Sequence, residues 1–126
     1  MATKKEAGKY VDGFVFSVPK TKKAEYKKLA REALVVWKKA GALDYKECRI
    51  EDVSAEHITF TFPKMAKTKP DEEVWFSYIV YRSKAERKSV NAKAMKYFDE
   101  KYGEKEMPMP FDLKRFAYAG FVVEVD

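Results

Sequence analysis

The chain has 126 residues, of which 46% are hydrophobic and 15% aromatic, and this is enough material for the core of one domain. No run approaches the ~20 consecutive apolar residues of a membrane-spanning helix, and residues 1–8 lack the apolar segment of a signal peptide. Cys48 is the only cysteine, which excludes an intrachain disulfide framework. We therefore expect a cytoplasmic protein, with residues 1–8 as a disordered or poorly ordered tail and residues 9–126 as a single domain.

The formal net charge of +6 is concentrated in one segment of the chain. Residues 20–40 contain eight basic and two acidic side chains, while the charges elsewhere cancel. The basic residues, among them Lys23, Lys27 and Arg31, are expected on the outer face of a helix. Such a charged face is typical of solvated helices. The alternative is a surface that binds an acidic partner or RNA.

The first predicted elements are a strand and a helix. Residues 9–18 alternate with period two, which predicts a strand that Pro19 ends. Thr21 is expected to cap the following helix, because a threonine hydroxyl can accept from a free backbone amide at a helix start. Apolar residues recur at helical spacing over residues 26–40, and Gly41 is expected to end the helix.

The middle of the chain predicts the second and third strands of the sheet, with a further short strand-like segment and an exposed loop between them. Residues 44–50 form one predicted strand, and the short alternating segment of residues 57–62 forms another. Residues 63–73 are rich in lysine and are expected to be an exposed loop. Residues 74–81 are the most hydrophobic run and are rich in residues that favour strands, so they are expected to form a central strand.

A second helix and a last strand complete the chain. Ser83 and Glu86 have the spacing of a capping box at a helix start, and Gly103 is expected to end that helix. The prolines of residues 107–112 exclude helix, but the apolar residues between them predict a loop that packs against the core. The last strand is expected over residues 114–125.

The resulting order β-α-β-β-α-β predicts an α+β protein with a ferredoxin-like fold, in which two helices lie on one face of an antiparallel sheet. Bulky side chains are expected on both faces of this sheet, for example Phe76 and Tyr78 on one and Trp75 and Ile79 on the other. The face without helices therefore needs a cover. We expect the same face of a second copy to provide it by two-fold symmetry, which would give a homodimer of the dimeric α/β barrel type.

Six polar residues stand in otherwise apolar segments and are candidates for a ligand pocket. They are Asp12, Ser77, Tyr81, Asn91, Arg115 and Tyr118. Polar groups in apolar walls are typical of ligand pockets, but they are also typical of core side chains with internal partners, and the core interpretation is favoured. Asp12 is expected either at the rim of the sheet or with a partner. Arg115 is not expected to be that partner, because antiparallel pairing of the terminal strands places the two far apart.

The sequence lacks the residue sets that metal sites, catalytic nucleophiles and nucleotide-binding loops require. His57 is the only histidine, so no cluster with metal-ligand spacing and no Cys/His or Ser/His/Asp set is present. The sequence contains neither GxGxxG nor a P-loop, and we expect no metal and no cofactor. Residues 74–81 also lack the pattern of an RNA-recognition module, which makes nucleic acid an unfavoured partner.

Seven segments spread along the chain match one known family. They are Tyr10-Val-Asp-Gly-Phe-Val with Val18-Pro19, Gly41-Ala-Leu, Glu47-Cys48, Val74 to Tyr81, Val90-Asn-Ala-Lys, Met109-Pro-Phe-Asp-Leu-Lys-Arg and Tyr118-Ala-Gly-Phe. Through these segments nearly the whole chain resembles the YbaA-like family, a domain of unknown function numbered 1428. The resemblance implies a dimeric α/β barrel and implies no established reaction.

Together these observations predict a homodimeric protein that binds a small molecule. The sequence leaves open whether it is a cofactor-independent enzyme, and it assigns no catalytic residue. The alternative is a non-catalytic interaction protein that uses the basic helix of residues 20–40.

Overall fold

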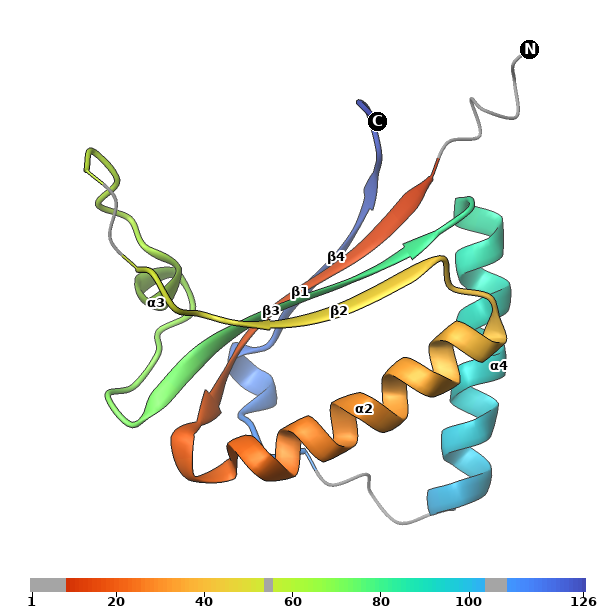
Figure 1. The fold of residues 1–126 in the computed structure, drawn as a ribbon, viewed down its shortest axis with the longest axis horizontal. Coiled ribbons are helices and arrows are strands. Elements are labelled where there is room, and N and C mark those ends of the chain that lie inside the picture. Colours follow the sequence, from red (N-terminus) through yellow and green to blue (C-terminus); the bar gives the residue numbers. More distant parts are fainter. Residues whose placement is uncertain (1–8, 54–55, 104–108) are drawn as a thin grey trace.

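The computed structural model describes residues 9–53, 56–103 and 109–126, so the tail expected over residues 1–8 lies outside the described residues. Two long helices, α2 and α4, lie on one face of a four-stranded sheet (Figure 1). The strands are β1 (Tyr10–Pro19), β2 (Asp44–Arg49), β3 (Glu72–Tyr81) and β4 (Ala117–Val122). The helices are α2 (Lys23–Ala40), α3 (Phe62–Met65) and α4 (Lys84–Tyr102), with single 3-10 turns η1 (Lys20–Lys22) and η2 (Leu113–Arg115).

The sheet has the order β2-β3-β1-β4, and every pair of neighbours is antiparallel. This order confirms the predicted ferredoxin-like fold. Phe14 of β1 lies opposite Ser77 on one side and Tyr118 on the other. Asp12, on the same strand, lies opposite Ile79 and Gly120 in the interior of the sheet. Of the two placements expected for Asp12, the rim of the sheet is therefore wrong and the partnered carboxylate is confirmed.

The hydrophobic core lies between the sheet and the two long helices. Alternate residues of a strand point to opposite faces, so one set of strand side chains meets the helices. Phe16 and Trp75 belong to this set and are almost completely buried. The ring of Tyr26 on α2 meets both edge-on, with centroids 5.4 Å from Phe16 and 5.1 Å from Trp75. These aromatic contacts fix α2 to the two central strands.

The helix ends follow the predicted signals at three of four positions. The Ser83 hydroxyl accepts from the Glu86 backbone amide at 3.1 Å, and Gly41 and Gly103 end the two long helices. The prediction for Thr21 was wrong, because this residue lies inside η1 and α2 starts without a side-chain cap. Lys20 donates its backbone amide to the Asp71 carbonyl oxygen at 2.9 Å, at the point where the chain tightens into the 3-10 turn.

The strand expected over residues 57–62 was also wrong. The Thr61 hydroxyl accepts from the Lys64 backbone amide, and Pro63 fits the first turn of a helix, so these residues begin α3. His57 has a positive φ of 76°, which interrupts an extended chain. Here local capping outweighs the alternating pattern.

The last strand is shorter than the expected span of residues 114–125. The Asp112 carboxylate accepts from the Lys114 backbone amide at 2.9 Å, which starts η2 and delays β4 to Ala117. Of the apolar loop expected over residues 107–112, the first two residues lie outside the described residues. Phe111 packs against the core cluster, as predicted for that loop.

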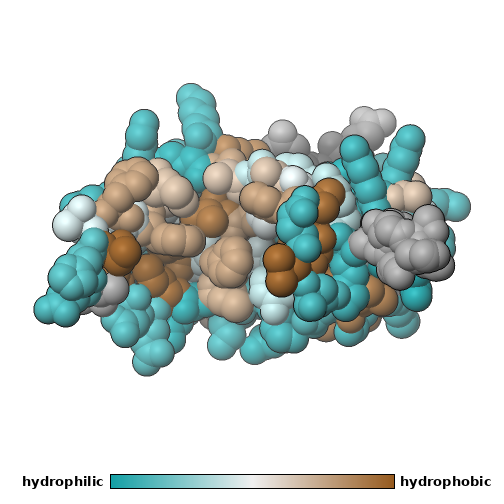
Figure 2. All heavy atoms as spheres, turned by 90° about the horizontal axis from the view of Figure 1, so that it is seen from above, coloured by the Kyte–Doolittle hydropathy of each residue, from teal (hydrophilic) through white to brown (hydrophobic). Residues whose placement is uncertain are grey.

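The sheet face without the long helices is covered at one end only. Residues 56–69, which we call the arm, lie on this face, because Thr68 hydrogen-bonds Ser17 at 2.9 Å and α3 contacts β3. Beyond the arm, Phe76 is 43% exposed and Phe121 is 55% exposed. Figure 2 looks down on this side and shows hydrophobic surface over its middle, with hydrophilic side chains around the edge. None of the described helices is long and apolar enough to cross a membrane.

We expect Ser83→Ala to lower the free energy of unfolding by about 1 kcal/mol, because it removes the side-chain cap of α4. Thr21→Ala is the matched control, since the Thr21 side chain caps no helix. Urea denaturation of both variants measures the difference. Equal losses in the two variants would contradict this account of the helix starts.

Candidate functional site

A cavity of about 590 Å³ lies between the sheet and the two long helices. Its wall is mainly aromatic, with the side chains of Phe14, Phe16, Tyr26, Trp37, Tyr45, Phe98, Phe111, Phe116 and Tyr118. Four further polar side chains line it, namely Asp12, Glu47, Ser77 and Asn91. An apolar hollow with a few convergent polar groups is the usual form of a small-molecule site.

Strand and helix periodicity bring these side chains together. On β2, Tyr45 and Glu47 are two residues apart and so share the helix-facing side of the sheet. On α4, Asn91 and Met95 are four residues apart and so share one side of the helix. Residues 109–116 close one end of the cavity with three apolar side chains, Met109, Phe111 and Phe116.

Asp12 is the most buried polar residue of the site, with 2% of its surface exposed. Its Oδ1 accepts from the Tyr118 hydroxyl at 3.0 Å and lies 3.2 Å from Nε of Arg87. Its Oδ2 accepts from the Tyr81 hydroxyl at 3.1 Å. Arg87 also contacts the Tyr118 hydroxyl. The carboxylate is therefore held by groups from β3, β4 and α4, and its charge is compensated by a guanidinium.

A chain of hydrogen bonds continues from Asp12 behind the cavity wall. The Tyr81 hydroxyl lies 3.1 Å from both Asp12 Oδ2 and Asn91 Oδ1. Asn91 Oδ1 accepts from Nε1 of Trp37 at 2.9 Å. Burial, followed by the charge of Asp12, raises the pKa of Tyr81, so this phenol stays protonated. The chain fixes Trp37 and Asn91 in the cavity wall.

Glu47 forms a second carboxyl cluster in the cavity. Tyr26 donates to its Oε1 and Tyr45 to its Oε2, each at 2.8 Å. Ser77 is its cross-strand neighbour on β3. Burial raises the pKa of Glu47 above its ordinary value of 4.5, although these hydroxyls act in the opposite direction. Burial also raises the pKa of both tyrosines, so the phenols remain hydrogen-bond donors.

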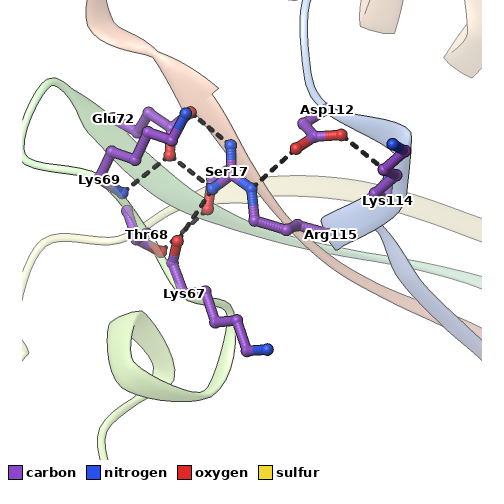
Figure 3. A network of polar contacts seen from close by, with 8 residues as sticks. All are labelled: Ser17, Lys67, Thr68, Lys69, Glu72, Asp112, Lys114 and Arg115. Carbon is purple, nitrogen blue, oxygen red and sulfur yellow. Dashed lines mark hydrogen bonds and ion pairs between the residues drawn. The ribbon is translucent and has the colours of Figure 1, made fainter.

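Arg115 lies in a separate polar network (Figure 3). Its guanidinium donates to the two oxygens of Glu72 at 2.7 and 2.8 Å and to Asp112 at 3.0 Å. It also donates to the Lys67 carbonyl oxygen at 3.0 Å. The hydrogen bond from Arg115 lowers the pKa of Glu72. This network ties η2 to the start of β3 and to the arm, so the role of Arg115 is to hold the segment that closes the cavity.

Four of the six predicted pocket residues therefore line one cavity, namely Asp12, Ser77, Asn91 and Tyr118. Tyr81 is fully buried, and it contacts Asp12 and Asn91 from behind the wall. Arg115 does not line the cavity, so its prediction as a pocket residue is wrong. It pairs with Glu72, whereas Asp12 pairs with Arg87, so Arg115 is not the partner of Asp12, as expected.

Sequence reasoning missed Glu47 and Arg87 as site residues. The alternation of Tyr45, Glu47 and Arg49 on one strand face was a usable signal for Glu47. No local signal marked Arg87, because it contacts Asp12 across 75 residues of sequence.

The basic helix face is placed on α2 as expected. Lys27 and Arg31 are exposed, and Lys23 is partly buried. None of these three residues lines the cavity between the sheet and the helices. Over the three described ranges, no group of three or more His, Cys, Asp or Glu side chains is arranged to hold a metal ion.

Comparison with known proteins gives both a family and a fold. Residues 9–113 match the family described as "Protein of unknown function (DUF1428)". The chain is 42% identical over 118 residues to "Uncharacterized protein YbaA" of Escherichia coli strain K12 and of Shigella flexneri, covering 94% of this chain and 98% of each relative. A dimeric ferredoxin-like protein from an uncultured marine organism has a TM-score of 0.55 at 12% identity, covering 94% of this chain and 97% of its own.

We expect the stability of the protein relative to Glu47→Gln to depend on pH. Because burial raises the pKa of Glu47 in the folded state, the folded protein binds this proton more tightly than the unfolded chain. The wild-type free energy of unfolding, minus that of Glu47→Gln, should fall as the pH rises from 4.5 through the folded pKa. Each unit of the shift contributes about 1.4 kcal/mol.

Denaturant titrations across this pH range measure that difference. Glu25→Gln, an exposed substitution on α2, is the matched control. A difference for Glu47→Gln that stays constant or rises with pH would contradict the effect of burial on this carboxyl.

Proposed function

The chain belongs to the DUF1428 family, and we propose that it is a cytoplasmic homodimer that binds a small, largely apolar molecule in the cavity between sheet and helices. The observation that carries this proposal is the aromatic wall with its four polar side chains around about 590 Å³. This volume falls within the range of about 300–1,000 Å³ that is common for ligand pockets. The proposal assigns binding and assigns no reaction.

The polar groups of the cavity are fixed before any ligand arrives. Asp12 and Asn91 are held through the hydroxyl of Tyr81, and Glu47 is held by two phenols. Groups that are already oriented lose little conformational freedom when a ligand binds. The aromatic walls would then supply affinity through burial of apolar surface, while the fixed polar groups would orient the ligand.

The homodimer is supported by the exposed apolar side chains on the sheet face opposite the helices. Phe76 and Phe121 are exposed on the sheet, and Phe60 and Phe62 of the adjoining arm are 71% and 48% exposed. A second copy related by two-fold symmetry would cover both groups with the same surface. The structurally similar marine protein is described as dimeric, which supports this arrangement. Cys48 is exposed beside Phe76, and a reducing cytoplasm would keep its thiol free.

We expect the protein in solution to have twice the chain mass of 14.7 kDa, and Phe76→Lys to convert it to a monomer. A lysine at this position would place a charge inside the interface. Val35→Lys is the matched control, because Val35 is similarly exposed, at 50% against 43% for Phe76, but lies on α2. Light scattering after size exclusion measures both. A wild-type monomer, or a dimer that survives Phe76→Lys, would contradict the proposed interface.

We expect the neutral fluorescent probe N-phenyl-1-naphthylamine to bind in the cavity and Ala33→Phe to abolish this binding. Ala33 lines the cavity, so a phenyl group there fills space that the probe needs. Ala24→Phe, on the exposed side of the same helix, is the control and should leave binding unchanged. Fluorescence titration reports the affinity. Equal binding to both variants would place the probe elsewhere and contradict the proposed site.

A further inference from the structure

We propose that the ligand of this cavity is a primary amine, bound as an ammonium ion by the Glu47 carboxylate, with an aromatic or aliphatic body against the aromatic walls. The inference rests on the proposed function, because it names the chemical class of ligand for the same cavity. It is carried by the different surroundings of the two carboxyl groups that line the cavity.

Asp12 already has a cation. Arg87 lies 3.2 Å from its Oδ1, and two phenols complete its hydrogen bonds. Its charge is thus compensated inside the protein, and it has little capacity left for a charged ligand.

Glu47 has no such cation among the residues that the structure describes. Its hydrogen-bonding side chains, Tyr26, Tyr45 and Ser77, are all neutral donors. The basic side chain two residues along the strand, Arg49, pairs instead with Glu73 at 3.5 Å. A carboxyl group in an apolar cavity is poorly solvated as an anion, and an opposite charge favours its ionised form. An ammonium group in the cavity would supply that charge.

The surrounding wall also favours a cation. Tyr26 and Tyr45 flank Glu47, and the Trp37 ring lies 6.4 Å from the Tyr45 ring between centroids. The faces of such rings carry negative potential and attract ammonium groups. An anionic ligand would meet two carboxyl groups and no uncompensated cation on the described wall. Charge and aromatic surface therefore select the same ligand class.

The titratable groups around Glu47 make the proposal testable by pH. Tyr26 faces it from α2 and Tyr45 from β2, while β3 contributes Ser77 and Ile79 to this part of the wall. Asp12 of β1 and Tyr118 of β4 also line the cavity, and α4 contributes the neutral Asn91 and Met95. Because the two phenols stay protonated, Glu47 is the group whose ionisation strengthens ammonium binding as the pH rises.

The test uses competition against N-phenyl-1-naphthylamine on the full-length protein with three matched compounds. These are 2-phenylethylammonium, 2-phenylethanol and 3-phenylpropanoate, which differ mainly in the charge of the polar group. We expect the ammonium compound to displace the probe at a concentration at least about tenfold lower than the alcohol, with the carboxylate weakest. The preference should increase between about pH 5 and about pH 8, where an alkylamine stays protonated.

Glu47→Gln should reduce the tenfold preference to near equality while the probe still binds, and Glu25→Gln should preserve it. Equal displacement by all three compounds in the wild-type protein would overturn the amine proposal and leave the cavity as a binding site. A probe that does not bind at all, or that binds Ala33→Phe unchanged, would overturn the proposed function itself. If Glu47→Gln does not fold, the pH dependence of the wild-type protein decides, and a preference that does not change with pH overturns the proposal.

Discussion

The structure depends on the burial of the Asp12 carboxylate in a central strand. A buried carboxylate requires partners, and here they come from β3, β4 and α4 through Tyr81, Tyr118 and Arg87. The contacts that compensate the charge thus also connect three strands of the sheet to one another and to α4. Through Asn91 and Trp37 they extend to α2. Four members of this network, Asp12, Trp37, Asn91 and Tyr118, form part of the cavity wall.

Two carboxyl groups share the cavity wall but differ in what surrounds them. Asp12 is compensated by a guanidinium, whereas the described partners of Glu47 are neutral hydroxyl groups. Burial without an adjacent cation explains why the pKa of Glu47 is raised. The carboxylate of Asp12 therefore has a structural role, whereas the carboxyl group of Glu47 is the one that we propose for ligand binding.

The sequence predicted most of the fold because its elements carry local signals. The capping box at Ser83 and the glycines at the helix ends are examples, and the hydrophobic run of residues 74–81 marked the central strand correctly. Residues 57–62 were mispredicted because the cap at Thr61 competes with the alternating pattern. The site was less predictable: Arg87 is remote in sequence from its partner, and Arg115 was expected in a pocket although Glu72 and Asp112 hold it elsewhere.

The most direct test of the cavity as a binding site is a crystal structure of the protein with 2-phenylethylammonium. The account predicts that the nitrogen lies within about 3 Å of a Glu47 carboxylate oxygen, with the ring between the sheet and α2. A ligand bound on the opposite sheet face, or side chains of residues 109–116 that fill an empty cavity, would contradict it.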